Sequence, residues 1–330
     1  MKQVQLGQSG PLVNRVGLGC MSFGGIYGAT DTEESHRTLH RALELGVTHL
    51  DVANIYGMGI SEKVIGSFLR DHPNARDTFV IATKAGIDNG PPRDFRNDEA
   101  YLRTELEGSL KRLGVDHVPL FYIHRRDQRI PVEHVMGTLQ RFIEEGKIGA
   151  IGLSEIAPST LARASKVHPI AAVQSEYSLW TRQPELGLLQ MCEKLGTTFV
   201  SFSPVGRGIF GDRPPIASRF GDGDFRKHNP RFQEPAYSAN ISAVEPLRAF
   251  AQARGVPLPT LAIAWALAKV PNSITIPGTR STDHLAQNTG AVDLVLTDDD
   301  LAEIEQLLPA GFAEGDRYSD AQRVGAELYC

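Results

Sequence analysis

Four polar side chains stand at the ends of short apolar stretches, where a catalytic site could use them. Asp51 ends one such stretch, and Tyr56 follows it five residues later. Lys84 and His124 each end or directly follow another. Folding does not require a carboxylate or an ammonium group at the end of a buried strand, and ionisable groups gather at functional sites. We therefore interpret the four residues as candidate catalytic groups.

Together these side chains could protonate a carbonyl oxygen. A free phenol has a pKa of about 10 and is a weak acid near neutrality. The ammonium group of Lys84 would lower the pKa of Tyr56, and Asp51 would keep Lys84 charged and oriented. His124 could hydrogen-bond a carbonyl oxygen and direct it toward Tyr56. Such a set suits reduction of a carbonyl by a hydride, which requires a nicotinamide cofactor.

Taken singly, each residue has an ordinary structural explanation. An aspartate often caps a turn, and a tyrosine often packs with its hydroxyl in water. Lys84 could extend to solvent, and His124 could be a hydrogen-bonded structural residue. Their joint occurrence at the ends of successive units is what predicts a site.

The elements that would position these residues follow a regular alternation of apolar runs and amphipathic stretches. After a hairpin in residues 1–16, eight strands are predicted at 16–20, 47–51, 79–83, 118–123, 148–153, 171–175, 198–203 and 273–276. Helices are predicted at 31–45, 62–69, 100–113, 132–145, 161–167, 185–195, 243–254, 260–269 and 283–289. Eight strand–helix units predict a closed (β/α)8 TIM barrel of the α/β class, with catalysis at the carboxyl ends of the strands.

The predicted barrel forms one domain, residues 1–330, with two additions. A long loop at 206–240 follows the seventh strand and is predicted to cover a cofactor. A further helix at 298–308 precedes a tail at 309–330. A doubly wound open sheet is the alternative, but it would require a Gly-x-Gly-x-x-Gly turn, and Gly17-Leu18-Gly19-Cys20 does not continue into one.

Composition excludes several other functions. The chain has 330 residues, 41% hydrophobic and 22% charged, and a formal net charge of −5. It offers no basic field for nucleic acid or a membrane surface. No signal-peptide pattern or long apolar stretch is present, which predicts a cytoplasmic protein. Cys20, Cys192 and Cys330 have no metal-ligand spacing, so we expect neither a metal nor a disulfide framework.

Asp51-x4-Tyr56-Gly57, Ala82-Thr83-Lys84 and Ile123-His124 resemble, in order and spacing, the catalytic tetrad motifs of the aldo-keto reductases. The resemblance runs from about Val16 to Ala291. It implies an NADP-dependent reductase in which Tyr56 is the general acid, Lys84 and Asp51 tune it and His124 positions the carbonyl.

The resemblance also implies a cofactor site. Ser154 and Gln174 match the residues that contact the nicotinamide carboxamide, and Phe202 stands where the family usually has a stacking tyrosine. Aromatic stacking needs no hydroxyl, so we expect Phe202 to keep this role. The remaining matched cofactor positions are Cys20, Met21, Ser203, Pro204, Val205, Gly206, Arg207, Gly208, Gly278, Thr279, Arg280, His284, Gln287 and Asn288. Of these, Val205–Gly208 would bind the pyrophosphate through backbone amides and Arg207.

Arg280 favours NADPH, because a guanidinium suits the 2′-phosphate. NADH stays possible, since His284 replaces a common Arg or Gln and Asp283 adds an opposing charge. The nearest branch by resemblance includes pyridoxal reductases. There the substrate, a small carbonyl compound, would lie among residues 85–98, 125–130, Trp180 and Tyr318. Neither the particular substrate nor the oligomeric state is predicted.

Two other functions stay open. A nicotinamide-binding regulatory or sensor protein of the same superfamily would carry the same motifs. A barrel enzyme forming a Schiff base through Lys84 would leave Asp51, Tyr56 and the cofactor motifs unexplained.

Overall fold

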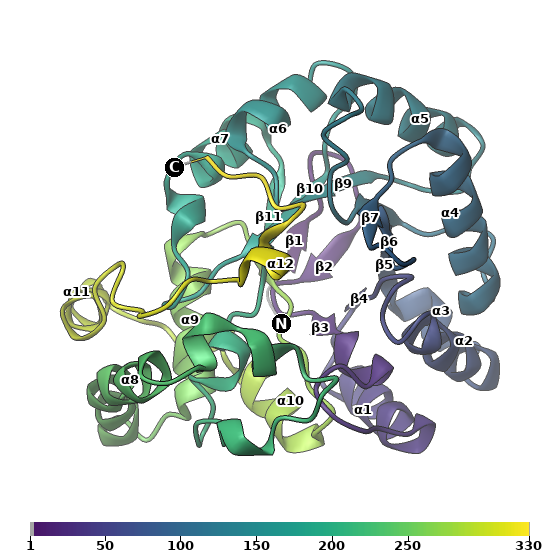
Figure 1. The fold of residues 1–330 in the computed structure, drawn as a ribbon. Helices are drawn as coiled ribbons and strands as arrows, with labels where there is room; N and C mark the ends of the chain where they lie inside the picture. The colour runs from purple at the N-terminus through teal and green to yellow at the C-terminus, as the bar shows by residue number, and fades with distance from the viewer. Residues whose placement is uncertain (1–2, 330) are drawn as a thin grey trace.

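A closed barrel of parallel strands forms the centre of the computed structural model, which describes residues 3–329 (Figure 1). Its strands are β3 (Leu18–Gly19), β4 (His49–Asp51), β5 (Val80–Ala85), β8 (Leu120–Ile123), β9 (Ile151–Ser154), β10 (Ala172–Glu176), β11 (Thr198–Phe202) and β12 (Ile274–Thr275). They pair in the order β12-β11-β10-β9-β8-β5-β4-β3. Parallel bridges Val16–Thr275 and Gly19–Gly278 join the two ends of this sheet. The predicted (β/α)8 fold is confirmed.

Helices surround the strands, as a parallel sheet with right-handed crossovers requires. They are α1 (Thr32–Glu44), α2 (Ile60–Asp71), α3 (Ala75–Thr78), α4 (Glu99–Leu113), α5 (Val132–Glu144), α6 (Pro158–Ala164), α7 (Leu188–Leu195), α8 (Ala236–Ala253), α9 (Leu258–Lys269), α10 (Thr282–Gly290), α11 (Asp298–Leu307) and α12 (Asp320–Arg323). Within residues 3–329, no helix is long and apolar enough to cross a bilayer.

Local sequence explains where several helices begin and end. Asp31 caps α1 by accepting the amide hydrogen of Glu34 at 2.7 Å, which satisfies one of the free N–H groups of the first turn. Gly114 follows α4 with a φ of 69°, a left-handed conformation that glycine adopts without a Cβ clash. Asp31 and Gly114 therefore define where α1 begins and where α4 ends.

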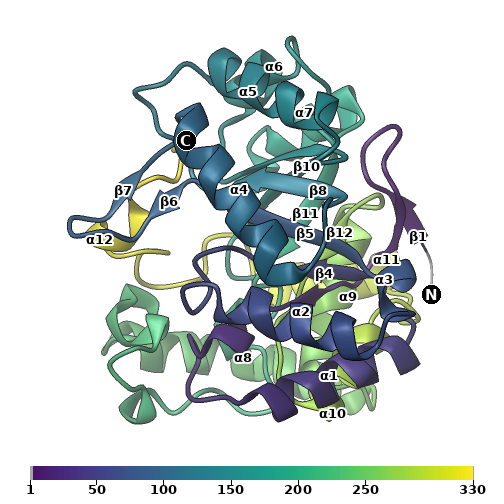
Figure 2. The same ribbon diagram turned by 90° about the vertical axis from the view of Figure 1, so that its right-hand side faces the viewer.

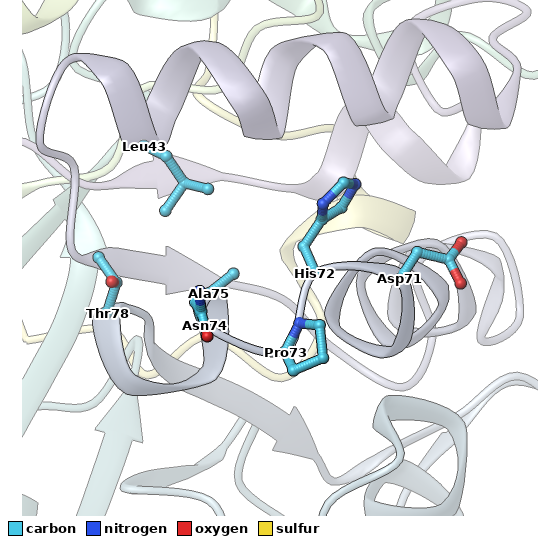
Figure 3. A pocket seen from close by; sticks show the side chains of 7 residues that line it. All are labelled: Leu43, Asp71, His72, Pro73, Asn74, Ala75 and Thr78. Carbon is cyan, nitrogen blue, oxygen red and sulfur yellow. The ribbon is translucent and has the colours of Figure 1, made fainter.

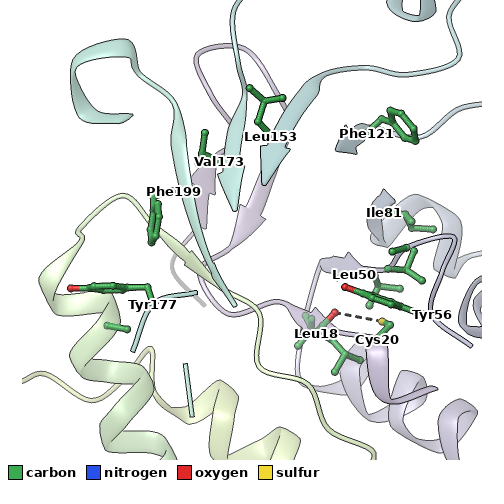
Figure 4. Packing of buried hydrophobic residues seen from close by; sticks show 14 of the residues in the cluster. Leu18, Cys20, Leu50, Tyr56, Ile81, Phe121, Leu153, Val173, Tyr177 and Phe199 are labelled. Carbon is green, nitrogen blue, oxygen red and sulfur yellow. Dashed lines mark hydrogen bonds between the residues drawn. The ribbon is translucent and has the colours of Figure 1, made fainter. Parts of the chain in front are cut away.

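Among the described residues, buried apolar side chains form three clusters, and the two largest make up most of the core. The larger core lies between the strands and the helices and includes Phe68, Phe142 and Trp265. Figure 4 shows part of it, with Tyr56 beside Leu50. The smaller core fills the barrel interior, where alternate residues of each strand point inward. Its members are Val4, Leu6, Val13, Ala82, Leu120, Tyr122, Ala172, Val200, Ile274 and Ile276.

The predicted N-terminal hairpin is present as β1 (Gln3–Gln5) and β2 (Leu12–Asn14). Leu6 and Val13 are fully buried and close one end of the interior core. Figure 2 shows this hairpin at one end of the barrel and α12 at the other. The hairpin is thus far from the predicted site.

Three features differ from the sequence expectations. The predicted loop at 206–240 ends earlier, because α8 begins at Ala236, and it contains four 3-10 turns. The segment 85–98 contains a hairpin, β6 (Ile87–Asp88) paired with β7 (Asp94–Phe95). The tail contains the short helix α12. Strands of two residues are too short to give an alternating pattern that sequence could reveal.

Candidate active site

Lys84 lies at the centre of the candidate site, fully buried in the barrel. Its ammonium group donates to the Asp51 carboxylate, to the Val52 carbonyl at 2.9 Å and to the Tyr56 hydroxyl at 3.4 Å. The three donated bonds use the three protons of an ammonium ion. The structure thus brings Asp51, Tyr56 and Lys84 into direct contact, as the motifs predict.

Strand register fixes this arrangement. Asp51 of β4 stands opposite Ala82 of β5, which places its carboxylate near Lys84 two residues further along. The chain after β4 continues to follow β5, with the amide of Asn54 donating to the Lys84 carbonyl at 3.1 Å. A turn from Ala53 to Tyr56, closed by a hydrogen bond of 3.1 Å, then brings the phenol back to the barrel mouth.

His124 completes the group from the end of β8. Its amide donates to the carbonyl of Ala85 at 2.7 Å, and its ring meets the ring of Tyr56 edge-on, with centroids 5.8 Å apart. Burial lowers the pKa of His124 well below its usual value, and the cations Lys84 and Arg125 lower it further. The imidazole is therefore neutral near pH 7 and can donate one hydrogen bond to an oxygen.

The electrostatics of Tyr56 differ from the sequence expectation. Burial raises its pKa, and although the neighbouring Lys84 lowers it, the net pKa lies above the ordinary value. Desolvation of the phenolate outweighs the ammonium because Asp51 neutralises much of the lysine's charge. Lys84 itself has a raised pKa: burial lowers it, but Asp51 and Tyr56 raise it more. The lysine is therefore charged.

A cleft of about 1490 Å³ opens over these residues. Nearly all of the predicted cofactor residues line it, namely Met21, Ser154, Gln174, Phe202, Ser203, Pro204, Val205, Arg207, Gly208, Gly278, Thr279, Arg280, His284, Gln287 and Asn288. Gly206 does not line it. Cys20 also lies outside the cleft, because its thiol is buried in the core and points to the Leu18 carbonyl at 3.5 Å (Figure 4).

Ser154 and Gln174 lie side by side at the inner end of the cleft, paired in register between β9 and β10. Each contacts a protein group in this structure. Gln174 donates to the second oxygen of Asp51 at 2.7 Å, and the Ser154 hydroxyl accepts from Arg125 at 3.2 Å. Gln174 thus extends the Asp51–Lys84 group, a link that the sequence did not predict.

Arg207 is buried rather than exposed on the loop. Its side chain is 3% exposed and donates to Glu176 at 2.5 Å and to the Arg317 carbonyl at 3.0 Å. A buried carboxylate requires such a partner. The Gly206 amide donates to the Ser203 carbonyl at 2.9 Å, and the Gly208 amide donates to the Val205 carbonyl at 3.0 Å. Both amides are therefore already hydrogen-bonded within the loop.

At the outer end of the cleft, Arg280 reaches across to the loop before α1. Its guanidinium donates to the carbonyls of Gly28, at 3.2 Å, and Ala29. Gln287 donates to Asp212 at 3.0 Å, and its buried carbonyl oxygen has no hydrogen-bond partner within the described chain. This end therefore offers both a cation and an unsatisfied acceptor.

Only part of the region predicted to hold the substrate lines the cleft. Arg93, Arg125 and Tyr318 line the cleft, but Trp180 does not. Trp180 is buried, and its ring packs edge-on against Phe232 at 5.3 Å.

Sequence reasoning missed a group of buried ion pairs beside the cleft, linking Glu155, Glu176, Arg207 and Arg317. Glu176 ends strand β10 just as Asp51 ends β4. The signal that identified Asp51, an acid at a buried strand end, could therefore have found Glu176.

A second hollow of about 420 Å³ lies between α1 and the turn after α2 (Figure 3). Its lining residues are Leu43, Asp71, His72, Pro73, Asn74, Ala75 and Thr78. None of them is a predicted site residue. In the part of the chain that the structure describes, no three His, Cys, Asp or Glu side chains are grouped to hold a metal ion. Cys20 and Cys192 are buried free thiols, and Cys330 lies outside the described residues.

Comparison with known proteins agrees with this geometry. A family model described as "Aldo/keto reductase family" matches residues 15–309. A protein of Glycine max named "Probable aldo-keto reductase 1" is 36% identical over 321 residues, which cover 96% of this chain and 92% of that relative.

Solved structures give the same result. The glycerol dehydrogenase AKR11B4 from Gluconobacter oxydans matches with a TM-score of 0.83 at 27% identity, over 93% of this chain and 94% of that one. The holo form of the aldo-keto reductase AKR11C1 from Bacillus halodurans matches with a TM-score of 0.76 at 27% identity, over 95% and 98% of the two chains. The chain therefore belongs to the aldo/keto reductase family, whose members are NAD(P)H-dependent oxidoreductases.

Proposed function

We propose that this protein reduces an aldehyde or a ketone to an alcohol with NADPH, and that Tyr56 is the general acid. The observation that supports this most directly is the buried contact of Lys84 with both Asp51 and Tyr56, beside a neutral His124. These are the groups that proton delivery to a carbonyl oxygen requires, and Asp51, Tyr56 and His124 line the cleft.

The cleft also suits a dinucleotide. It runs from Gln174 at the inner end to Arg280 and Gln287 at the outer end, and the unpartnered oxygen of Gln287 can accept a hydrogen bond. We assign Ser154 and Gln174 to the carboxamide, Phe202 to stacking on the nicotinamide, and the loop 203–208 to the pyrophosphate. Arg280 is assigned to the 2′-phosphate, since a guanidinium binds phosphate oxygens bidentately.

The chain's own groups would then move one proton. His124 donates a hydrogen bond to the substrate's carbonyl oxygen and holds it near Tyr56. A nicotinamide held by Ser154, Gln174 and Phe202 would supply the hydride for the carbonyl carbon. Tyr56 transfers its hydroxyl proton to the oxygen, and the Lys84 ammonium stabilises the resulting phenolate. Asp51 keeps Lys84 oriented throughout, and solvent restores the proton to Tyr56.

Substitution of the phenol tests the proposal. Tyr56→Phe keeps the ring and removes only the proton donor, so kcat for carbonyl reduction should fall at least about 10³-fold, within the range for loss of an acid catalyst and its hydrogen bond. The dissociation constant for NADPH, measured by fluorescence titration, should change less than about twofold. Turnover retained by Tyr56→Phe would exclude Tyr56 as the acid. Wild-type protein that binds NADPH but reduces no member of a carbonyl panel would favour the regulatory alternative.

A further inference from the structure

Two arginines line the substrate end of the cleft without a carboxylate partner. Arg125 follows His124 at the end of β8, and Arg93 lies in the loop between β6 and β7. Among residues 3–329, neither guanidinium forms an ion pair with a carboxylate. The surrounding acids are paired elsewhere: Asp51 with Lys84, Asp94 with Arg129, Glu155 with Arg317 and Glu327 with Arg126.

Arg125 is held in place by its neighbours. Its side chain donates to the carbonyl of His124 at 2.6 Å and to the Ser154 hydroxyl at 3.2 Å. Its own carbonyl accepts from Asn97 at 3.1 Å. Both side-chain contacts use the same nitrogen, Nη1, and a guanidinium carries five N–H donors in a fixed fork. A rigid, partly free guanidinium therefore stands next to the residue that would hold the carbonyl.

Arg93 faces the same end of the cleft from a different element. Its guanidinium lies 5.6 Å from the ring of Phe95. Both arginines lower the pKa of His124, after the larger effect of burial, and Arg93 has a lowered pKa of its own, caused first by burial and then by Arg125. The two cations are thus close enough to repel one another and to act on His124.

Arg125 is half-buried and Arg93 is exposed where both line the cleft, and an anion that contacts both would be attracted by two like charges. Arginine binds carboxylate and phosphate oxygens in a bidentate manner. Aromatic side chains, Tyr27, Phe225 and Tyr318, also line the cleft. They offer apolar surface for the part of a substrate that joins its carbonyl to such an anion.

We propose that the substrate carries an anionic group, a carboxylate or a phosphate, in addition to its carbonyl, and that Arg93 and Arg125 bind this group. Arg125 then fixes the distance between the anion and the carbonyl held by His124, and Arg93 supplies the second cation. The substrate class is therefore aldehydes or ketones that are negatively charged at neutral pH. This inference rests on the proposed reductase function.

Matched aldehydes test the proposal with the full-length protein. NADPH consumption is followed with 4-carboxybenzaldehyde, with 4-formylphenyl phosphate and with methyl 4-formylbenzoate, which has no charge. The wild-type protein should show kcat/KM at least about tenfold higher for one or both anions than for the ester. The better anion identifies the group that the arginines prefer. Equal kcat/KM for all three compounds would overturn the proposal.

Arg93→Gln removes the positive charge of Arg93 and leaves the contacts of Lys84 with Asp51 and Tyr56 in place. The ratio of kcat/KM for the preferred anion to kcat/KM for the ester should fall about tenfold, mainly through a higher KM for the anion. Arg96→Gln is the matched control: Arg96 is a nearby arginine that pairs with Asp88 and Asp98 and should leave the preference unchanged. Equal losses for anion and ester in Arg93→Gln would contradict an anion site.

Failure of the reaction is distinguishable from failure of the anion site. If none of the three aldehydes is reduced although NADPH binds, the proposed function fails. Calorimetry in the presence of NADPH then compares 4-(hydroxymethyl)benzoate with its methyl ester. Tighter binding of the acid, lost in Arg93→Gln, supports the anion site, and equal affinities overturn it.

Discussion

Lys84 shows how a single buried charge determines what the site can do. Its ammonium lowers the pKa of Tyr56 by favouring the phenolate, but burial raises that pKa more, so the phenol stays protonated near neutrality. In the proposed mechanism, reduction would use the protonated phenol, whereas oxidation of the alcohol would use the phenolate. The two directions of the reaction should therefore depend differently on pH.

We predict that kcat/KM for reduction is flat between about pH 6 and about pH 9, below the raised pKa of Tyr56. Over the same range kcat/KM for alcohol oxidation should rise about tenfold per pH unit, because the phenolate fraction does so below the pKa. His124 adds no transition near pH 6.5, since its pKa lies well below that value. Initial rates in both directions across this range are the measurement.

Lys84→Met provides the matched variant. Without the ammonium the pKa of Tyr56 rises further, so oxidation at about pH 8 should fall at least about 100-fold, roughly the pKa effect of a close charge. An oxidation rate that is independent of pH in the wild-type protein would contradict the assigned acid.

At the residue level, sequence reveals which side chains end the strands but not which partners they meet. Asp51, Lys84 and His124 were identifiable because polar groups at buried strand ends need an explanation. The bond from Gln174 to Asp51 joins residues separated by 123 positions, and barrel closure alone brings them together. Arg207 illustrates the same limit, because its partner Glu176 is fixed by packing of the loop.

Among the elements, Glu62 joins three parts of the barrel wall. This residue of α2 is fully buried and accepts hydrogen bonds from Thr83 of β5, at 2.5 Å, and from Arg112 of α4, at 2.6 Å. It lines no part of the cleft. Its function is therefore to hold α2 and α4 against the strand that carries Lys84.

We predict that Glu62→Gln lowers the free energy of unfolding by about 3 kcal/mol, because a buried ion pair loses one charge. Urea unfolding at constant pH measures this change. Glu33→Gln, in an exposed pair with Arg37, is the control and should cost less than about 1 kcal/mol. A similar loss of unfolding free energy in both variants would show that burial of the Glu62 ion pair does not add to stability.

The positions of the barrel strands and principal helices could be predicted from hydrophobic periodicity, whereas the structure of the irregular segments could not. The alternation of apolar runs and amphipathic stretches predicts all eight strands and the principal helices, because a parallel barrel buries its strands on both faces. The β6–β7 hairpin and α12 are held by tertiary contacts instead. The ring of Phe95 in β7 lies against Gly325, for example, a contact between distant segments that local sequence does not encode.

At the scale of the whole molecule, the C-terminal tail, residues 309–330, links the barrel to the loop 206–235. Figure 1 shows the yellow tail crossing in front of the strands. Arg317 pairs with Glu155 at 2.5 Å and, through its carbonyl, accepts from Asn229 of the loop at 2.7 Å. Gln322 donates to the Phe225 carbonyl at 3.0 Å. The tail thus connects the loop to the end of β9.

Removal of residues 317–330 should release the loop but leave the barrel folded, because the last strand and α11 precede the cut. We predict that trypsin cleaves the loop after Arg219, which is exposed and followed by Phe220, at least about tenfold faster, since cleavage follows local opening. The dissociation constant for NADPH should rise as well, because the loop lines the cleft. Circular dichroism checks that the barrel persists.

Asp320→Asn provides the control for this truncation. Its side chain is exposed and, within residues 3–329, forms an ion pair with Arg323 at the surface, so the tail and its contacts with Glu155 and the loop remain. Trypsin should cleave this variant at the wild-type rate. Equal protection of the loop in the truncated and full-length proteins would show that the loop is held by the barrel alone. Faster cleavage in the truncated protein only would show that the tail restrains the loop.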